Sequence, residues 1–400
     1  MQVRSETAKL RQVILHPPGR CHELLLPEET QSRNPQYLLM DDILFVQKAK
    51  QEHTELVRVL GTTAEVVYVT NLLRDIFKND AVREEALHIT GFNEYNDLPD
   101  DPVELVKVLL SGELNGKRLS PPCPNLIFAR DIGSIVGNSV VPSYAAKFAE
   151  LTTESPRGRE MTLARLIIRH HPLFADYNIV DINEGCSKHD EKTCEGGDIH
   201  VINDRIVLVG VSERTDDEAV QRMAPQLFIN GFECVLKVRL PKHRSSMHLD
   251  TVFTMISANE ALVCAKIVND GITCTAIMPN SQKEMPGGLI QVLGELGVKL
   301  DTYPCGGDDP TQAVREHWTD AANAMAIAPG VIVGYDRNVA TAECLRLRGG
   351  YDVLTAAEYM ADPAPYLAGN KKAIICISSA ELSRGRGGPR CMSFPLSRAN

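Results

Sequence analysis

Asn125–Asp131 reads NLIFARD, and Gly137–Pro142, which reads GNSVVP, follows it after a short turn. Apolar residues bounded by polar and glycine residues predict a strand, so the pair predicts a strand, a turn and a second strand. The first strand would end in the pair Arg130-Asp131. Because this arrangement returns further along the chain, it decides the fold class.

Three later stretches repeat the arrangement and a fourth begins it. They are Asp198–Ile202 into Arg205–Gly210, Leu249–Ile256 into Ala261–Ile267, Ala324–Ala328 into Val331–Gly334, and Cys391–Pro395. Helical stretches such as Asp216–Gly231 and Glu284–Gly297 lie between them. One polar residue enters each strand, and these residues are Asp131, Asp198, Asp250, Asn323 and Cys391. Their irregular repeat predicts five strand-and-helix units around an axis, with these residues at one pole. An ordinary α/β domain with unrelated hairpins stays open as the alternative.

The N-terminal part predicts a strand over Gln12–His16, a helix over Gln47–Leu60 that stops at Gly61, and a strand over Glu65–Val69. From Asn71 to about Gly116 the pattern becomes helical, and Asp101 before Pro102 is typical of a helix start. We therefore expect a helical insertion over residues 71–116. Residues 1–70 and 117–400 would form the catalytic α/β part.

Composition narrows the class of protein. With 400 residues, 44% hydrophobic and 24% charged, the chain is typical of a globular protein with a large core. The net charge of −10 argues against nucleic acid and anionic membranes as partners. No 18-residue apolar run and no signal-peptide pattern occur. Eleven scattered cysteines are typical of reduced thiols, so we expect a cytoplasmic protein.

A candidate nucleophile lies in Gly385–Arg398, which reads GRGGPRCMSFPLSR. Between Arg384 and Arg390, three glycines and three arginines precede Cys391. Glycine allows close approach of the backbone to a ligand, and nearby arginines favour the reactive thiolate. We therefore expect a lowered thiol pKa and a nucleophilic Cys391. A buried structural cysteine beside a basic loop is the alternative.

Two further motifs could supply partners for this sulfur. In MHLDTVFTM, His248 and Asp250 would project from one face of a strand. In CEGGDIH, two glycines lie between Glu195 and Asp198 and indicate close approach of the backbone to a ligand. Carboxylates, a histidine and a cysteine suit a cationic substrate that a thiolate attacks at an electrophilic carbon.

A zinc site is the competing interpretation of one stretch. Cys186, His189, Cys194 and His200 have the spacing C-x2-H-x4-C-x5-H, and zinc takes Cys and His ligands. The spacing lies outside the usual finger patterns, and His200 would lie within a strand. We therefore expect no metal at these residues.

Six stretches, in this order, resemble those of arginine deiminases. They are LLMDDILFV at 38–46, FARD at 128–131, EGGD at 195–198, MHLDTVFTM at 247–255, IAPGVIVGYDRN at 327–338 and ELSRGRGGPRCMS at 381–393. The resemblance implies the fold of the guanidino-group-modifying superfamily, a pentein-type, pseudo-symmetric propeller of five ββαβ units with a small α-helical insertion. It also implies hydrolysis of L-arginine to L-citrulline and ammonia without a metal or organic cofactor.

The resemblance implies a role for each matched position. Cys391 would be the nucleophile, His248 the general acid and base, and Glu195 the residue that orients it. Asp131 and Asp250 would hold the guanidinium. The positions matched around the amino-acid end of the substrate are Asn125, Phe128, Asp198, Arg214, Gly385 and Arg386, with Arg159 as the family arginine that binds the carboxylate.

Three other functions stay open. An amidinotransferase would resolve the same covalent intermediate with an amine in place of water. A deiminase of agmatine would leave arginines such as Arg214 and Arg386 without a carboxylate. A binding protein without catalysis is disfavoured by the complete set of Cys391, His248 and carboxylates. The oligomeric state, including a homo-oligomer, is not fixed by the sequence.

Overall fold

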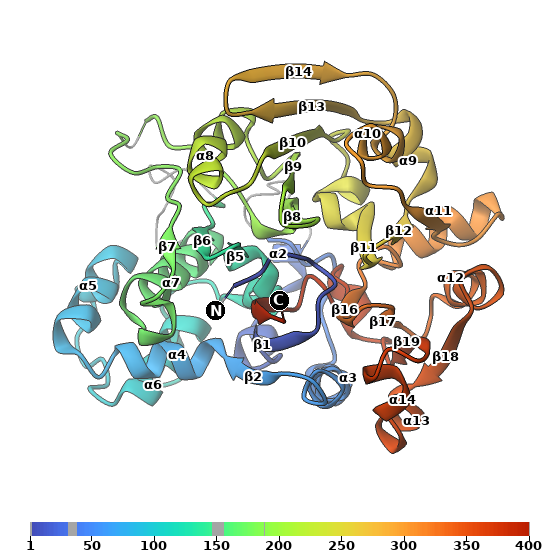
Figure 1. Cartoon of the computed structure of the whole chain (residues 1–400). Helices are drawn as coiled ribbons and strands as arrows, with labels where there is room; N and C mark the ends of the chain where they lie inside the picture. The colour runs from blue at the N-terminus through green and yellow to red at the C-terminus, as the bar shows by residue number, and fades with distance from the viewer. Residues whose placement is uncertain (1, 31–37, 146–155, 188, 400) are drawn as a thin grey trace.

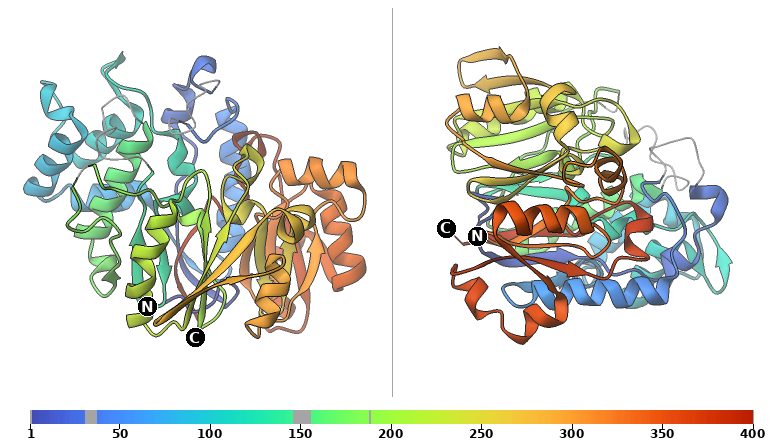
Figure 2. Two further views of the ribbon diagram at one scale, coloured as in Figure 1. Left: turned by 90° about the horizontal axis from the view of Figure 1, so that it is seen from above. Right: turned by 90° about the vertical axis from the view of Figure 1, so that its right-hand side faces the viewer.

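The structure is a computed structural model and describes residues 2–30, 38–145, 156–187 and 189–399. Within these residues, five sheets of three to five strands and one two-stranded hairpin form a mixed α/β fold. Figure 1 shows the sheets set around the centre of the molecule, with most helices at the outside. The two views of Figure 2 show the marked chain ends on the same side of the molecule.

All five sheets contain the same pairing of three strands. A first strand pairs antiparallel with a second, which pairs parallel with a third. The five sets are β20-β1-β2 (Phe394–Arg398, Leu10–Leu15, Glu65–Tyr68), β5-β6-β7 (Gly133–Val136, Ser139–Pro142, Asn178–Ile179), β8-β9-β10 (Ile199–Val201, Ile206–Val211, Cys234–Arg239), β11-β12-β15 (Phe253–Ser257, Glu260–Val263, Asp301–Pro304) and β16-β17-β19 (Met325–Ala328, Val331–Tyr335, Lys372–Ile377). The first set joins the two ends of the chain in one sheet.

Additional strands extend two of these sheets. In one, β13 (Thr273–Met278) and β14 (Ser281–Met285) follow β10 at the edge. In another, β18 (Tyr351–Thr355) pairs parallel with β19. The hairpin consists of β3 (Glu113–Leu114) and β4 (Lys117–Arg118).

The helices pack on the outer edges of the sheets. They are α1 (Arg20–Glu23), α2 (Pro27–Thr30), α3 (Val46–Leu60), α4 (Val69–Ile76), α5 (Asp80–Thr90), α6 (Pro102–Ser111), α7 (Pro156–His170), α8 (Asp217–Ile229), α9 (Ala265–Asp270), α10 (Leu289–Glu295), α11 (Pro310–Trp318), α12 (Val339–Cys344), α13 (Ala356–Ala361) and α14 (Ala364–Leu367). The expected helix end at Gly61 is confirmed, since Gly61 is the C-cap of α3.

Helices occupy most of the stretch between residues 69 and 111, as the sequence predicted. At the start of α6 the Asp101 side chain accepts a hydrogen bond from the Glu104 amide at 3.1 Å, which confirms the predicted N-cap. Phe77, Phe92 and Leu109 from this stretch share one buried core with Leu163 of α7. The helices are therefore attached to the α/β part by a common hydrophobic core.

Four strand predictions are wrong at their polar ends, one of them at Asp198, which lies in the 3-10 turn Gly196–Asp198 ahead of β8. NLIFARD forms two 3-10 turns, Pro124–Ile127 and Ala129–Ile132, because the side chain and amide of Asn125 are bonded to Leu39 and Glu160 instead of a neighbouring strand. Leu249–Thr251 is likewise a 3-10 turn ahead of β11, so His248 and Asp250 do not share a strand face. Cys391 precedes β20 instead of starting it.

Element bounds differ in two further places. Ala261–Ile267 was predicted as a strand, yet β12 ends at Val263 and α9 begins at Ala265. The stretch Glu284–Gly297 was predicted as one helix, yet Glu284 lies in β14 and the helix begins only at Leu289. Pro286, Gly287 and Gly288 separate the two elements. Gly287 has a left-handed φ of 97°, which ends the strand before α10 can start.

Candidate active site

The five polar residues that enter the inner strands lie next to one another, each just before its strand. Cys391 Sγ lies 3.6 Å from Asp250 Oδ2, and the Cys391 amide donates to Asn323 Oδ1 at 2.8 Å. Asn323 Nδ2 donates to the Asp250 carbonyl at 3.1 Å. The carboxylate of Asp198 accepts from the Leu249 amide at 2.9 Å, and Asp131 faces His248. These contacts bring the five residues together in one place.

Cys391 is buried, with 6% of its surface exposed. Burial raises the pKa of its thiol well above the usual value, and the carboxylates of Asp250, Asp131 and Asp320 raise it further, while Arg390 acts in the opposite direction. The expected net lowering of this pKa is therefore wrong, because burial and the carboxylates outweigh Arg390. Before a substrate binds, the sulfur is held as a thiol.

The three arginines before Cys391 have other partners. Arg390 donates to Asp250 Oδ2 at 2.7 Å and to Glu6 Oε2 at 3.1 Å. Arg384 donates to Asp42 Oδ2 at 2.7 Å, and Arg386 lies 3.8 Å from the centre of the Trp318 ring. These arginines therefore pair with carboxylates or an aromatic ring, and only Arg390 among them lowers the thiol pKa of Cys391.

The glycines of the same loop serve close packing. A Cβ atom at Gly387 would lie 2.3 Å from Phe128, and one at Gly388 would lie 2.6 Å from the Asn323 carbonyl oxygen. Both contacts are far inside van der Waals distance, so any larger residue would push the Cys391 loop away from its neighbours. The close approach seen here is to protein atoms, and approach to a ligand stays a prediction.

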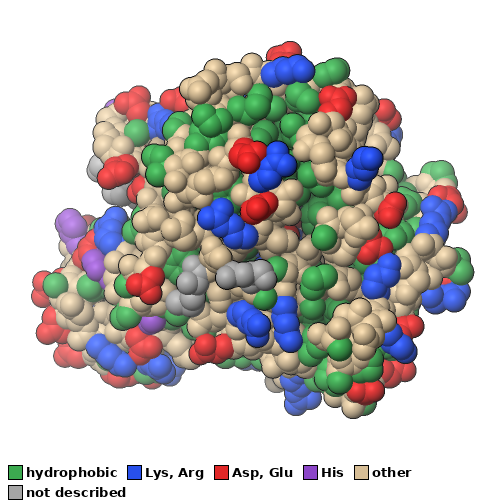
Figure 3. Space-filling view, in the orientation of Figure 1, with side chains coloured by type: hydrophobic (Ala, Val, Ile, Leu, Met, Phe, Trp, Pro, Cys, Tyr) green, Lys and Arg blue, Asp and Glu red, His purple; other side chains and the backbone are tan. Residues whose placement is uncertain are grey.

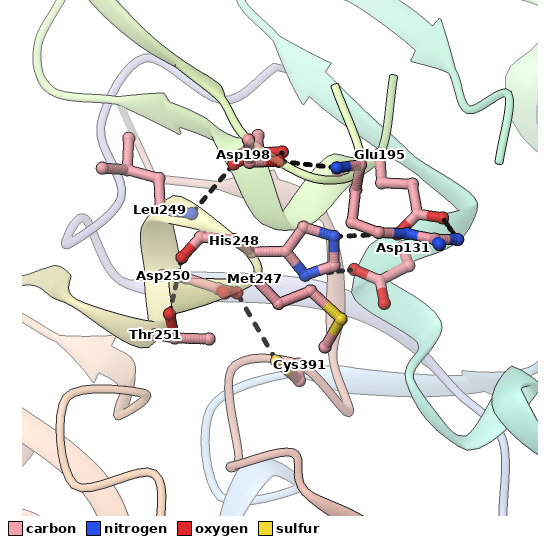
Figure 4. Close-up of polar contacts among 12 residues, drawn as sticks. Asp131, Glu195, Asp198, Met247, His248, Leu249, Asp250, Thr251 and Cys391 are labelled. Atoms are coloured by element: carbon pink, nitrogen blue, oxygen red, sulfur yellow. Dashed lines mark hydrogen bonds and ion pairs between the residues drawn. The ribbon is translucent and has the colours of Figure 1, made fainter. Parts of the chain in front are cut away.

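His248 lies between two carboxylates, as Figure 4 shows. Its Nε2 is 2.8 Å from Glu195 Oε2, and its Nδ1 is 3.9 Å from Asp131 Oδ1. Burial lowers the pKa of His248, but Asp131, the hydrogen bond to Glu195 and Asp198 together raise it to about 9. At neutral pH the ring is therefore an imidazolium that can donate a proton.

Two buried arginines hold Glu195. Arg157 donates from Nε to Glu195 Oε1 at 3.3 Å, and Arg214 donates from Nη2 to the same oxygen at 2.6 Å. Burial raises the pKa of Glu195, but Arg157, Arg214 and His248 outweigh burial and lower it well below the usual value. Glu195 thus stays ionised, with its second oxygen left for His248.

Asp131 and Asp250 each present one oxygen without a hydrogen-bond partner. Among the residues that the structure describes, none donates a hydrogen bond to the buried Asp131 Oδ1 or Asp250 Oδ1. Burial raises the pKa of Asp131 to about 6, while His248 acts to lower it. Such oxygens are costly unless a donor reaches them, so the site is prepared for a cation with several N–H groups.

Asp198 and Asn125, both predicted to touch substrate, are engaged by the protein. Asp198 Oδ2 accepts from the Ser212 and Thr215 hydroxyls, each at 2.7 Å, while its other oxygen holds the Leu249 amide. Asn125 Nδ2 donates to Glu160 Oε2 at 3.0 Å, and its oxygen accepts from the Leu39 amide at 2.7 Å. Both residues fix the turns that carry His248 and Phe128.

Phe128 and Gly385 meet at the wall of the Cys391 loop. The position of a Cβ on Gly385 lies 3.7 Å from Phe128 Cζ and 3.2 Å from Met40 Cε. Phe128 is buried, with 3% exposure. This part of the site is apolar.

Arg159 is not brought to the carboxylates of Asp131 and Glu195. Its guanidinium donates to the Leu109 carbonyl at 3.0 Å, bonds Ser120 and Pro121, and lies over the Phe92 ring. Arg157, which sequence reasoning missed, reaches Asp131 Oδ2 at 3.3 Å instead. The signal for it was the pair Arg157 and Glu160, whose i,i+3 spacing puts both on one face of α7.

The four residues of the competing zinc interpretation do not converge. His189 is exposed, whereas Cys194 and His200 are buried, and Cys186 accepts from Arg222 at 2.9 Å. In the described ranges, the only group of three potential ligands within metal-binding reach is Asp131, Glu195 and His248. Arg157 already supplies a positive charge to both of these carboxylates, which disfavours a metal ion there.

The geometry agrees with a comparison to protein families. The family model described as arginine deiminase matches residues 36–113 and 89–398 of the chain.

The chain belongs to the arginine deiminase family.

Arginine deiminase of Listeria monocytogenes serotype 4a (strain HCC23) is 33% identical over all of this chain and 98% of its own length. Arginine deiminase of Limosilactobacillus reuteri (strain DSM 20016) is 31% identical with the same coverage. The resemblance seen in the six motifs is therefore confirmed along the whole length of this family member.

Solved structures share the fold of this family member at low sequence identity. Dimethylarginine dimethylaminohydrolase, as an adduct with S-methyl-L-thiocitrulline, is 16% identical with a TM-score of 0.53, over 97% of this chain and 100% of that one. The N-terminal domain of ArgZ, covalently bound to a reaction intermediate, is 12% identical with a TM-score of 0.53, over 97% and 98%. These likenesses establish a mixed α/β fold of small sheets.

The distribution of surface charge concerns nucleic acid as a partner, and the hydrophobicity of the helices concerns a membrane. On the face in Figure 3, lysines and arginines are interspersed with acidic residues and do not gather into one basic area. None of the helices that the structure describes combines the length and hydrophobicity needed to cross a membrane.

Proposed function

We propose that this member of the arginine deiminase family hydrolyses L-arginine to L-citrulline and ammonia through a covalent intermediate on Cys391. The observation that carries the proposal is the pair of buried oxygens without donors, Asp131 Oδ1 and Asp250 Oδ1, beside His248 and Cys391. A guanidinium is planar, carries five N–H donors and bonds carboxylates in pairs. It would satisfy both oxygens and bring its central carbon to the sulfur.

The bound guanidinium would also activate the nucleophile. The thiol pKa of Cys391 is raised by burial and by carboxylates, and a cation bound between those carboxylates acts in the opposite direction. Binding therefore favours loss of the thiol proton to solvent. The thiolate forms only when its substrate is present, which protects the sulfur from other electrophiles.

The chemistry then needs only side chains. The Cys391 sulfur adds to the guanidinium carbon, and the His248 imidazolium donates a proton to the leaving nitrogen, which departs as ammonia. The product on the enzyme is an amidino-thioether. The neutral His248 takes a proton from water, and the hydroxide adds to the same carbon. The sulfur then leaves as thiolate, and the new hydroxyl group loses its proton to solvent as citrulline is released.

The other end of the substrate would meet Arg214 and Arg386, with Asn125, Phe128, Asp198 and Gly385 shaping the wall. We infer that Arg157, in place of Arg159, completes the set of buried arginines around the site. Arg157 is fully buried and touches both Asp131 and Glu195. Arg159 is assigned to the attachment of the helical stretch instead.

The proposal extends to architecture and setting. The common pairing of strands in the five sheets supports a five-unit ββαβ propeller with residues 71–116 as an insertion. All eleven cysteines are free, which supports a cytoplasmic protein. No metal, organic cofactor, nucleic acid or membrane is required by the chemistry, and a homo-oligomer is compatible with it. An amidinotransferase is the second candidate, and glycine as acceptor distinguishes the two.

The test is citrulline formation by the purified chain, with Cys391→Ser beside it. We expect the wild type to release citrulline and ammonia in equal amounts from arginine, with no guanidinoacetate when glycine is added. Cys391→Ser should give the same circular dichroism spectrum and lose turnover, because serine is a poor nucleophile without an activating base. Citrulline formation by Cys391→Ser at the wild-type rate contradicts the proposal.

A further inference from the structure

Three arginines are buried near the centre of the molecule, behind the active site. They are Arg130, Arg390 and Arg398, with exposures of 4%, 1% and 4%. Arg130 lies in the turn directly before β5, which is close to the centre in Figure 1. Its amide donates to the Cys391 carbonyl at 2.9 Å, so the group borders the nucleophile loop. Buried positive charges are costly unless negative charges and acceptors surround them.

Only one of the three arginines is paired with carboxylates. Arg390 donates to Glu6 Oε2 at 3.1 Å and to Asp250 Oδ2 at 2.7 Å. In the described ranges, no carboxylate lies within ion-pair distance of Arg130 or Arg398. Because Glu6 and Asp250 supply two negative charges against three positive ones, one positive charge is left unbalanced.

The two unpaired arginines also keep buried N–H groups without acceptors. Nothing in the part of the chain that the structure describes accepts from Arg130 Nε, Arg130 Nη2 or Arg398 Nε. Arg398 Nη1 donates to the carbonyls of Ala8 and Ala326, at 2.6 and 2.9 Å, which bring no net charge. Buried donors of this kind point to an acceptor that carries negative charge.

The pKa values of these groups reflect the excess of positive charge. Burial lowers the pKa of Arg398 to about 9 together with Arg130 and Arg390, although Glu6 raises it. Burial and Arg390 likewise lower the pKa of Arg130 to about 10. Burial lowers the pKa of His200, which also lies near Glu6, well below its usual value, so its ring adds no charge. All three guanidinium groups therefore stay charged at neutral pH and repel one another.

We propose that Arg130 and Arg398 bind a small monovalent anion such as chloride near the centre of the molecule. A spherical anion accepts several N–H groups at once from different directions, and a single charge balances the one that Glu6 and Asp250 leave over. A water molecule accepts such donors too, but it brings no charge. Because the arginines meet only in the folded chain, the bound anion stabilises the fold.

Bromide tests the site in a crystal, because it replaces chloride and its anomalous X-ray scattering identifies it. Crystals of the wild-type chain soaked in sodium bromide should show an anomalous peak in contact with the guanidinium groups of Arg130 and Arg398. Anomalous peaks at surface residues alone, or a water molecule without anomalous signal between these two arginines, overturn the inference. This measurement needs no variant.

Unfolding by urea separates a specific site from binding at crystal concentration only. Bromide is exchanged for gluconate at constant ionic strength, and the free energy of unfolding should rise with bromide as binding to one site on the folded chain requires. In Arg130→Met the fitted dissociation constant for bromide should rise at least about 10-fold, because a charged donor is lost. Arg205→Met, which removes an exposed arginine paired with Glu233, should keep the wild-type constant. A wild type that does not respond to bromide, or an Arg130→Met that responds equally, contradicts the inference.

Discussion

Replacing Glu195 by glutamine should change the charge of His248. Glu195 Oε2 lies 2.8 Å from His248 Nε2, and both side chains are buried. The pKa of His248 is raised from 6.5 to about 9, and the difference corresponds to roughly 3 kcal/mol in favour of the imidazolium. Glu195 supplies a main part of this rise in the His248 pKa. Without the Glu195 carboxylate, the positive charges of Arg157 and Arg214 near the His248 ring are no longer balanced by it. We expect the His248 pKa in Glu195→Gln to fall by more than about one unit, or 1.4 kcal/mol.

The assay is an NMR titration of the His248 ring, with the alkaline limb of kcat as the functional counterpart. The wild-type imidazolium should persist until about pH 9, and general-acid catalysis should fail as pH rises through that value. In Glu195→Gln both events should move towards neutral pH. The exposed Glu184→Gln serves as the matched control. A His248 titration at the same pH in wild type and Glu195→Gln refutes the assigned role of Glu195.

Two other substitutions separate function from stability. Arg157→Met should lower citrulline formation at least 10²-fold, because Asp131 and Glu195 lose the cation that they share. Arg159→Ala should instead lower the melting temperature and keep the preference for arginine over agmatine. Loss of that preference in Arg159→Ala contradicts the assignment of Arg159 to stability. Burial lowers the pKa of His53 to about 4, so the unfolded chain binds the proton first and stability is lost as pH falls from 6.5 towards 4. His53→Gln should therefore remove about 2 kcal/mol of the loss in unfolding free energy between about pH 8 and about pH 5, measured in urea, with exposed His243→Gln unchanged.

The polar residues of the site could be predicted from sequence because each precedes an apolar strand. Asp131, Asp198, Asp250, Asn323 and Cys391 stand just before β5, β8, β11, β16 and β20. The turns themselves could not be predicted. NLIFARD and LDTVFTMI contain enough apolar residues for a strand. In the structure, however, Asn125 is hydrogen-bonded to Leu39 and Glu160, and the Leu249 amide donates a hydrogen bond to Asp198. Such long-range partners leave no local pattern in the sequence.

The direction in which a side chain points was the second feature that could not be predicted from the sequence. Arg157 and Arg159 lie two residues apart at the start of α7, and only the packed structure decides that one faces Glu195 and the other Ser120. The charge of Cys391 was misjudged for a related reason. Neighbours along the chain suggested a positive environment, but Arg390 is neutralised by Asp250 and Glu6, so that burial and carboxylates set the thiol pKa.

The measurement that tests the central claim most directly is mass spectrometry of Cys391 during turnover. His248→Ala should form the amidino-thioether slowly and fail to hydrolyse it, because no side chain remains to activate water. The account predicts that arginine adds to the chain the mass of arginine less that of ammonia, and that digestion places this mass on the peptide containing Cys391. An unmodified Cys391 in a chain that still converts arginine, or the same mass on another residue, contradicts the account.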